Sequence, residues 1–358
     1  MRSKLPLSNS AFTLVELLVS MTILAVIIVL ITQVLSMVTT ATSASNRQMD
    51  CSSLARIALD RFGNDFEGMI SQGGATAVYY SESGATGNSA IGFVSKSRPR
   101  FTTSTGGSPT RLVSTDIRGA TIGYRMKNTS VTFSGVNQVS FPMLNRGDGP
   151  FTFSIQSSGS RSAYHFPHVF ARQIVSGTTP RLPGDLVSTS GTERAVNWQG
   201  MALGLLRMHI SFVLSDGRVV QDPPAYLNFQ AEDSANPPSN LAVMDSNGKY
   251  SPAGETSLVT PIAFSRVDSK DVNGLYVKGL IVGLVVLDES TLKLSYLQDN
   301  AFVSKVATKL GRPTVDGQSP MQVWNNNLKA WNADNTDKTL LPLRQNIRFF
   351  QRYYSVNR

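Results

Sequence analysis

The chain has 358 residues, of which 41% are hydrophobic and 16% are charged, and its formal net charge is +9 at pH 7. This composition excludes an intrinsically disordered chain, because it supplies enough apolar surface for one large core or two smaller ones. The basic residues are scattered rather than gathered in a basic helix or a recognised nucleic-acid module, so we expect no nucleic-acid partner. The single cysteine, Cys51, excludes an intrachain disulfide framework.

The first predicted element is an apolar helix near the N-terminus. Residues 17–38 hold no charged side chain, and at about 1.5 Å per residue a helix of this length spans the roughly 30 Å hydrocarbon core of a bilayer. The stretch is too long for the apolar part of a cleaved secretory signal. Because Arg2 and Lys4 precede it, we expect a single-pass helix with a cytoplasmic N-terminus and all later residues outside.

One acidic residue, Glu16, lies at the start of this apolar stretch. A carboxylate inside a membrane costs several kcal/mol unless it is paired or near the interface, so it indicates a function with a partner. A local explanation is also available. Thr13-Leu14-Val15-Glu16 fits the S/T-x-x-E capping box, in which the Glu side chain reaches back to a free N–H at a helix start. Both interpretations stay open on local geometry alone.

The segment AFTLVELLVSM, residues 11–21, resembles the prepilin-type signal of type IV pilins and secretion pseudopilins. The resemblance implies that a prepilin peptidase cuts between Ala11 and Phe12 and methylates the new amino group of Phe12. It also implies that the Glu16 carboxylate meets this amine on an adjacent subunit and sets the register of the bundled helices. The family usually has Gly before the cut, where this chain has Ala11, so an unprocessed anchor stays open.

The helix is expected to continue beyond the membrane as an amphipathic segment. Its apolar residues recur every four positions, at Leu54, Ala58, Phe62 and Phe66, with Ile57 and Ile70 beside this stripe. The pairs Arg56 with Asp60 and Arg61 with Asp65 are expected on the exposed side. Gly73 and Gly74 then end a spine helix that runs from about Phe12 to about Ile70.

The remaining sequence is rich in predicted β-strands. Alternation or β-branched enrichment marks residues 121–126, 131–141, 151–156, 207–214, 217–229, 275–288 and 343–356. Asp216-Gly217 supplies a positive-φ pair for a tight hairpin turn. Residues 274–288 are typical of a central strand, residues 320–331 of a short helix with Val323, Leu328 and Trp331 inward, and the C-terminal segment of an edge strand.

Stretches rich in Gly, Ser, Thr and Pro separate these elements, at residues 71–118, 157–163, 176–194 and 231–257, and we expect long surface loops there. The predicted fold class is α+β, with the spine helix packed on an antiparallel β-rich domain. The predicted divisions are a leader at 1–11, a transmembrane and assembly segment at 12–38, an amphipathic segment at 39–71, and a globular periplasmic domain at 72–358.

Candidate catalytic and metal-binding residues are few. His165 and His168 lie three apart, but Pro167 separates them and no acidic third ligand is near, and His209 falls in a predicted strand. Asp245, Asn247 and Glu255 offer oxygen ligands for Ca²⁺ from one segment, although their spacing does not fit an EF-hand. Because the sequence has no nucleophile elbow, phosphate loop or zinc helix, we expect a protein that is not an enzyme and holds no cofactor, with Ca²⁺ as a weak candidate.

The resemblance implies a structural subunit, a minor pseudopilin or minor pilin of a type II secretion or type IV pilus-like envelope assembly. Large minor pseudopilins of the type II secretion tip share this plan, as do the type C proteins of the Verru_Chthon cassette. The implied partners are the prepilin peptidase, other pilin or pseudopilin subunits and an inner-membrane assembly platform, and the implied location is the inner membrane. A membrane-anchored or secreted binding module without a filament role stays open as an alternative.

Overall fold

The computed structural model describes residues 13–69, 77–81, 87–96, 101–103, 109–111, 120–131, 139–150, 197–223, 243–244, 250–251, 259–262, 277–299, 301–334 and 340–356. The chain divides into two compact units, residues 1–50 and residues 51–358. The first holds the N-terminal part of helix α1, and the second holds the rest of α1, the sheets and the C-terminal helices.

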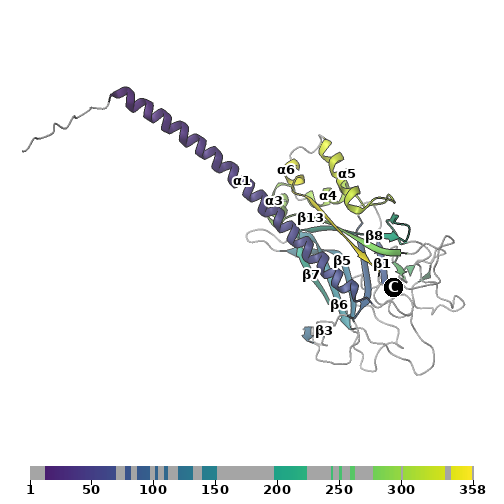
Figure 1. The fold of residues 1–358 in the computed structure, drawn as a ribbon. Helices are drawn as coiled ribbons and strands as arrows, with labels where there is room; N and C mark the ends of the chain where they lie inside the picture. The colour runs from purple at the N-terminus through teal and green to yellow at the C-terminus, as the bar shows by residue number, and fades with distance from the viewer. Residues whose placement is uncertain are drawn as a thin grey trace, which may run out of the picture. The chain divides into compact units, whose positions relative to one another are not determined.

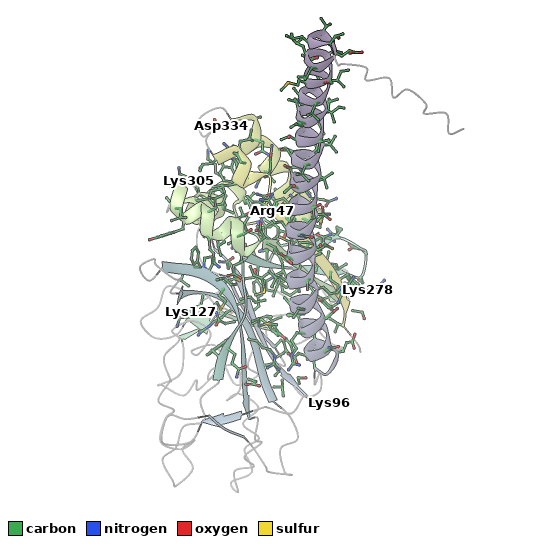
Figure 2. The ribbon with its side chains drawn as sticks, turned by 90° about the vertical axis from the view of Figure 1, so that its left-hand side faces the viewer. Arg47, Lys96, Lys127, Lys278, Lys305 and Asp334 are labelled. Atoms are coloured by element: carbon green, nitrogen blue, oxygen red, sulfur yellow. The ribbon has the colours of Figure 1, made fainter. Side chains whose placement is uncertain are left out.

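Helix α1 runs from Leu14 to Glu67 over 54 residues, as the predicted spine helix requires. Its end is tied to strand β2, because the Lys96 N–H donates to the Gly68 carbonyl at 2.8 Å and Met69 forms an isolated antiparallel bridge with Ser95. Lys96 is labelled beside the end of the helix in Figure 2. The glycines expected to stop the helix, and Ile70, lie outside the described residues.

The larger sheet is antiparallel, with the strand order β10-β11-β12-β1-β2-β5-β6-β7. Its strands are β1 (Ala77–Ser81), β2 (Ser89–Ser95), β5 (Ala120–Val131), β6 (Val139–Pro150), β7 (Asn197–Leu203), β10 (Val243–Met244), β11 (Tyr250–Ser251) and β12 (Val259–Ile262). A separate hairpin pairs β3 (Phe101–Thr103) with β4 (Pro109–Arg111). The long β5–β6 hairpin lies next to β7 at one end of the sheet (Figure 1).

The smaller sheet is also antiparallel and has the order β14-β13-β8-β9. Its strands are β8 (Leu205–Leu214), β9 (Val219–Val220), β13 (Val277–Val286) and β14 (Arg348–Ser355). Strand β13 has a neighbour on both sides and is largely buried, which confirms the central strand predicted at residues 274–288. Strand β14 lies at the edge, as predicted for the C-terminal segment.

In the described part of the chain between β13 and β14, four helices lie next to the smaller sheet (Figure 1). They are α3 (Glu289–Gln298), α4 (Phe302–Leu310), α5 (Pro320–Ala333) and α6 (Leu341–Arg344). Helix α5 was predicted, and it begins with a capping box formed by Ser319 and Gln322. Of its predicted inward residues, Val323 and Trp331 are buried and Leu328 is partly buried, and Trp324 is buried as well.

The main core joins α1 to both sheets. The Phe62 ring lies 6.1 Å from that of Phe93 on β2, 4.9 Å from that of Tyr124 on β5 and 5.1 Å from that of Tyr354 on β14, measured between centroids. Aromatic pairs at such separations add to the stabilisation from burial. A second core lies under the C-terminal helices and includes Trp324 and Trp331. The structure therefore confirms the α+β class, with the amphipathic segment of the spine helix packed on antiparallel sheet.

One predicted strand and two predicted loop regions differ from the structure. Residues 131–141 do not form one strand, because β5 ends at Val131 and β6 begins at Val139. Residues 71–118 are not all surface loop, because β2 within them is buried along its whole length. Residues 151–156, together with 157–163 and 176–194, lie outside the described residues, and residues 231–257 include the short strands β10 and β11.

The hairpin between β8 and β9 is present, but its turn differs from the prediction. Only Gly217 has a positive φ, at 88°, and Asp216 does not share it. The Gly217 N–H donates to the Leu214 carbonyl, and the Leu214 N–H donates to the Arg218 carbonyl, both at 2.9 Å. These bonds describe a three-residue loop whose last residue is left-handed, which is the second common way to close a hairpin.

Candidate functional site

The start of α1 is closed by a capping box between Thr13 and Glu16. The Thr13 N–H and the Thr13 hydroxyl both donate to Glu16 Oε2 at 3.0 Å, and the Glu16 N–H lies 3.3 Å from Thr13 Oγ1. The carboxylate is thereby held over the N-terminus of the helix, where the helix dipole favours negative charge. The structure therefore confirms the capping box that the sequence predicts for Thr13 and Glu16. Ala11 and Phe12 lie outside the described residues.

The side chains after this cap are exposed and apolar. From Leu14 to Val38 the large hydrophobic residues of α1 are at least 46% exposed, and Figure 2 shows the side chains of α1 as sticks all round this part of the helix. The described residues include one helix long and apolar enough to cross a membrane, and this is α1, near the N-terminus. Such a surface needs an apolar medium or other helices to cover it.

Several hydroxyl side chains in and just beyond the apolar part of α1 donate hydrogen bonds to carbonyls of the same helix. The Thr22 hydroxyl donates to the Val19 carbonyl and the Thr32 hydroxyl to the Ile28 carbonyl, each at 2.8 Å. Ser20, Thr39, Thr40 and Thr42 make equivalent bonds to carbonyls three or four residues before them. Because these hydroxyls require no water, they reduce the cost of placing the helix in a bilayer.

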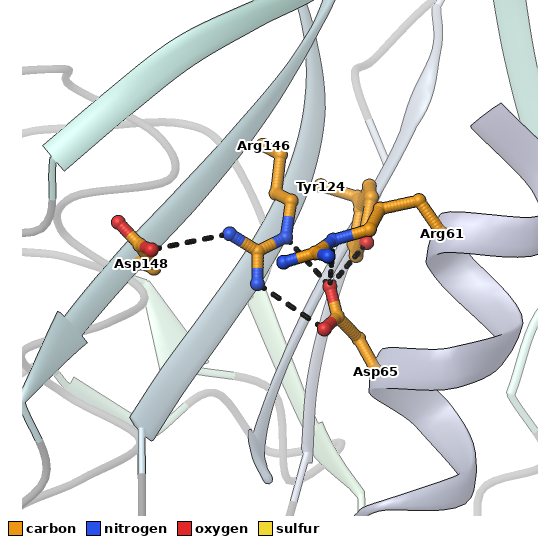
Figure 3. Close-up of polar contacts among 5 residues, drawn as sticks. All are labelled: Arg61, Asp65, Tyr124, Arg146 and Asp148. Atoms are coloured by element: carbon orange, nitrogen blue, oxygen red, sulfur yellow. Dashed lines mark hydrogen bonds and ion pairs between the residues drawn. The ribbon is translucent and has the colours of Figure 1, made fainter. Parts of the chain in front are cut away.

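A buried charged cluster fixes the other end of α1 to the larger sheet (Figure 3). Arg146 on β6 donates two hydrogen bonds to Asp65 on α1, from Nε to Oδ2 at 2.6 Å and from Nη2 to Oδ1 at 3.2 Å. The Tyr124 hydroxyl on β5 donates to Asp65 Oδ2 at 2.6 Å, and Arg146 Nη1 donates to Asp148 Oδ2 at 3.2 Å. Arg61 completes the cluster, with its Nε 3.6 Å from Asp65 Oδ2.

The protonation states in this cluster follow from burial and from Asp65. Burial raises the pKa of the Tyr124 phenol, and the charge and hydrogen bond of Asp65 raise it further. Burial by itself would lower the pKa of Arg146, but the hydrogen bonds and charge of Asp65 outweigh it, so the net direction is upward. Tyr124 therefore stays a hydrogen-bond donor and Arg146 stays a cation, which is what a buried carboxylate needs from its neighbours.

Comparison with known protein families gives one finding, and it falls on the start of the chain. Residues 7–32 match the family model of the prokaryotic N-terminal methylation motif. The match includes Ala11, Phe12 and Glu16, and it ends within the exposed apolar part of α1. No curated protein and no solved structure matches the chain.

The N-terminal methylation motif is the signal of type IV pilins and pseudopilins. It implies processing by a prepilin peptidase, and with the hydrophobic helix that follows it indicates anchoring in a membrane before assembly. Proteins with this signal are typically structural subunits rather than enzymes. The motif and the long helix on an antiparallel sheet together indicate a subunit of a type IV pilus-like or type II secretion-like assembly.

His209 is the one candidate histidine that the structure describes, and it is buried on β8. Its Nδ1 lies 3.1 Å from the Ser89 hydroxyl and its Nε2 lies 3.1 Å from Gln221 Oε1. Because Gln221 Nε2 donates to the carbonyls of Val315 and Gln318, the Gln221 oxygen is an acceptor, and His209 Nε2 must hold the proton. His209 is thus a structural link between the two sheets.

The charge state of His209 agrees with this role. Burial lowers its pKa to about 3, the Arg312 and Arg207 charges act in the same direction, and the Gln221 hydrogen bond opposes them. The ring is therefore neutral at pH 7. Among the residues that the structure describes, no group of three or more His, Cys, Asp or Glu could hold a metal ion. His165, His168, Asp245, Asn247 and Glu255 lie outside the described residues.

Sequence reasoning missed the Asp65 cluster. Asp65 was expected on the exposed face of the helix, but it is 2% exposed, and its principal partner is Arg146 rather than Arg61. Asp60 was expected to pair with Arg56 and pairs instead with Arg352 on β14. Ile57, expected beside the buried stripe, is exposed. The sequence did contain one indication that Asp65 is buried. Asp65 is three residues after Phe62 and directly before Phe66, so on a helix it lies on the same side as these buried rings.

Proposed function

We propose that this protein is a minor structural subunit, a minor pseudopilin or minor pilin, of a type II secretion or type IV pilus-like assembly. In this proposal residues 1–11 are a leader, and prepilin peptidase cuts between Ala11 and Phe12 and methylates Phe12. Residues 12–38 hold the precursor in the inner membrane with its N-terminus in the cytoplasm. The observation that supports it most is the position of Glu16, inside the methylation motif and at the first turn of an exposed apolar helix.

The capping box is compatible with a second role for Glu16 as the register residue of assembly. Both Thr13 bonds end on Oε2, and within the described residues no hydrogen bond ends on Oε1. One carboxylate oxygen can therefore close its own helix while the other accepts a hydrogen bond from the Phe12 amine of an adjacent subunit. In an apolar bundle, a stagger that leaves both charges unmatched is penalised by several kcal/mol, so the pair selects one register.

A minor position in the assembly is supported by size. In its described residues, the unit from residue 51 to residue 358 holds an eight-stranded sheet, a four-stranded sheet, the β3–β4 hairpin and four C-terminal helices. A unit of this bulk is hard to repeat at close spacing along a thin filament, so we place it among minor or tip subunits. Its expected partners are other pilin-class subunits and an inner-membrane assembly platform.

Mass spectrometry of the N-terminus of the native protein tests the processing step. We expect a chain that begins at methylated Phe12. A chain that begins at Met1, or one cut beyond the apolar helix, would contradict the proposal. An Ala11→Gly variant, which restores the usual residue before the cut, should be processed at least as fully as the natural chain.

The assembly step is tested with Glu16→Gln in the full chain, and with Glu67→Gln as the matched control at an exposed position of the same helix. We expect both variants to be processed, and only Glu16→Gln to lose its partners when membrane complexes are isolated. If Glu16→Gln keeps the same partners as the natural chain, the register role is wrong. A processed chain that associates with no pilin-class subunit would favour the alternative, an anchored binding module.

A further inference from the structure

Gln33 is a polar side chain within the apolar part of helix α1. It lies five residues before Val38, the last residue of the uncharged stretch 17–38. A straight helix therefore places it about 7–8 Å inside the apolar layer that this stretch would span. Side chains on an α-helix tilt toward its N-terminus. The nearer surface of the layer lies in the opposite direction, beyond Val38, so this tilt takes the Gln33 amide away from water.

The Gln33 amide differs from the neighbouring hydroxyl groups, which bond to carbonyls of their own helix. Thr32, directly before it, donates to the Ile28 carbonyl at 2.8 Å. Within the part of the chain that the structure describes, no hydrogen bond reaches the Gln33 amide. A side-chain amide has two N–H donors and a carbonyl acceptor, and the core of a bilayer holds no water to pair with them. Gln33 therefore requires a partner from outside its own helix.

The residues on the same face as Gln33 form a seam with heptad spacing. Along the chain they follow one another in alternating steps of four and three residues, which is the a/d pattern of a coiled coil. The seam consists of Val15, Val19, Thr22, Val26, Val29, Gln33, Ser36 and Thr40. Its a positions are 19, 26, 33 and 40, and every one of them except Gln33 holds a β-branched residue, the type that two-stranded coiled coils favour there.

A second copy of this chain supplies the partner that Gln33 requires. Two copies that insert by the same N-terminal signal have parallel apolar helices at the same depth. In a parallel, in-register pair each a residue faces its counterpart, so Gln33 meets Gln33 of the second copy. The amide is complementary to itself, because an N–H of one donates to the carbonyl of the other. A shift by one heptad would set one Gln33 against Val26, whose side chain forms no hydrogen bond.

We propose that the apolar helix of this protein forms a parallel, in-register pair with a second copy of the chain through the seam around Gln33. The two Gln33 amides bond to each other between the helices, as a polar residue at a single a position does when it sets register. The seam valines, which are at least 47% exposed in the single chain, cover one another in the pair.

This contact goes beyond the proposed function, because it requires the apolar helix in a bilayer and requires no filament. It also differs from the assembly contact of Glu16. An in-register pair sets both Glu16 side chains at one level, whereas contact between Glu16 and Phe12 of a neighbour requires a stagger of four residues, about 6 Å. The pair is therefore a state of the chain in the membrane that precedes assembly.

Disulfide cross-linking of the full chain in native membranes tests which side of the helix meets the second copy. The natural cysteine is removed by Cys51→Ala. One cysteine is then introduced by Ser36→Cys on the seam, or by Leu35→Cys as the control, two residues from Gln33 and so on the opposite side of the helix. Under mild oxidation we expect Ser36→Cys to give a product of twice the mass of the chain, and Leu35→Cys to give little. Equal yields, no product, or a product that contains another protein would overturn the pair.

A second set of variants tests Gln33 itself in the Ser36→Cys chain. Gln33→Leu removes the amide, so we expect the yield of the cross-linked pair to fall roughly fivefold. Gln33→Asn retains an amide and should retain most of the yield. Thr32→Val is the matched control, because the Thr32 hydroxyl bonds within its own helix. An unchanged yield with Gln33→Leu would overturn the role of Gln33.

The N-terminus of the same samples separates this inference from the proposed function. A chain that begins at methylated Phe12 but gives no cross-linked pair would overturn the pair and leave the proposed function standing. A cross-linked pair from a chain that still begins at Met1 would support the pair and contradict the proposed processing. We expect Gln33→Leu to be processed as fully as the natural chain, since position 33 lies outside the segment matched by the methylation motif.

Discussion

Arg146 on β6 grips Asp65 on α1 with two hydrogen bonds, the shorter of them 2.6 Å, and both side chains are less than 10% exposed. The pair connects the spine helix to the larger sheet at the last turns of the helix. The apolar contacts of Phe62 and Phe66 would tolerate small shifts of the helix along the sheet, since such packing is not directional. The bidentate ion pair fixes the position of the helix, because its two hydrogen bonds can form at one position only.

Replacing Asp65 by Asn should destabilise the globular unit by about 3 kcal/mol, because Arg146 loses a buried carboxylate partner and keeps its desolvation cost. The measurement is denaturant unfolding of the full chain in detergent, followed by circular dichroism. The Arg61→Ala variant is the control. The Arg61 side chain is 33% exposed and its Nε lies 3.6 Å from Asp65 Oδ2, so its removal should cost about 0.5 kcal/mol or less. Equal losses for the two variants would contradict the role assigned to Arg146.

Stability should fall as the pH is lowered through the range set by His209. The pKa of His209 is about 3 in the folded protein, against 6.5 for a solvent-exposed histidine. Below pH 6.5 the unfolded chain binds a proton that the folded chain does not, so the contribution is present above pH 6.5 and is lost as the pH falls toward 3. The slope is at most roughly 1.4 kcal/mol per pH unit.

The His209→Gln variant isolates this effect, since it retains a polar side chain but does not titrate. It should be less stable than the natural chain at pH 7 and should show a smaller decrease in stability between pH 6.5 and pH 4. His165, His168 and the carboxyl groups are the same in both chains, so the difference between the two pH profiles reports His209. Parallel profiles would show that His209 does not titrate as stated.

Gly283 lies where helix α5 approaches strand β13 most closely. A Cβ atom there would be 2.7 Å from Pro320 Cβ and 3.0 Å from the Trp324 ring. Gly283→Ala should therefore push α5 from the sheet and cost about 1–3 kcal/mol by overpacking. Thermal unfolding measures the loss, and Lys278→Ala on the exposed side of the same strand should stay within about 0.5 kcal/mol of the natural chain. A Gly283→Ala chain as stable as the natural one would contradict this packing.

Substitution of Gly217 tests the effect of backbone conformation separately from the effect of packing. Its φ is 88°, and no atom lies within 4 Å of the position a Cβ would take. Gly217→Ala should cost about 1 kcal/mol, and Gly217→Asn should cost less, because Asn tolerates a left-handed backbone better than Ala. Unfolding midpoints of the two variants give the comparison. Equal costs would indicate that the turn relaxes to another conformation.

The spine helix was the most predictable part of the fold, because its signals are local. The apolar run after Glu16, the four-residue repeat from Leu54 to Phe66 and the Thr13 to Glu16 capping pattern are all readable within one or two turns. Helix α5 was predicted for the same reason. Helix α4 was missed although Phe302, Val306 and Leu310 follow the same spacing. Helix α3 could not be recognised, since it buries Thr291 and Ser295 beside Leu292 and exposes Leu294 and Leu297, which breaks the apolar periodicity.

The residues of the candidate site also differ in how far the sequence predicted them. Glu16 and the residues around the cut were identified because the methylation motif is a contiguous stretch, and residues 7–32 match it. The Asp65 cluster was not identified, because Tyr124 and Arg146 come from strands 59 and 81 residues further along the chain. The link through His209 likewise joins Ser89 to a residue 120 positions away.

The sequence by itself determined the elements whose physical cause is local: an apolar helix, its cap, its amphipathic continuation and the N-terminal processing signal. The tertiary structure decided which charges are buried, which strands are neighbours and which side of α3 faces solvent. Those outcomes depend on long-range pairing and on the satisfaction of buried polar groups such as Asp65, whose partners Tyr124 and Arg146 lie far along the chain.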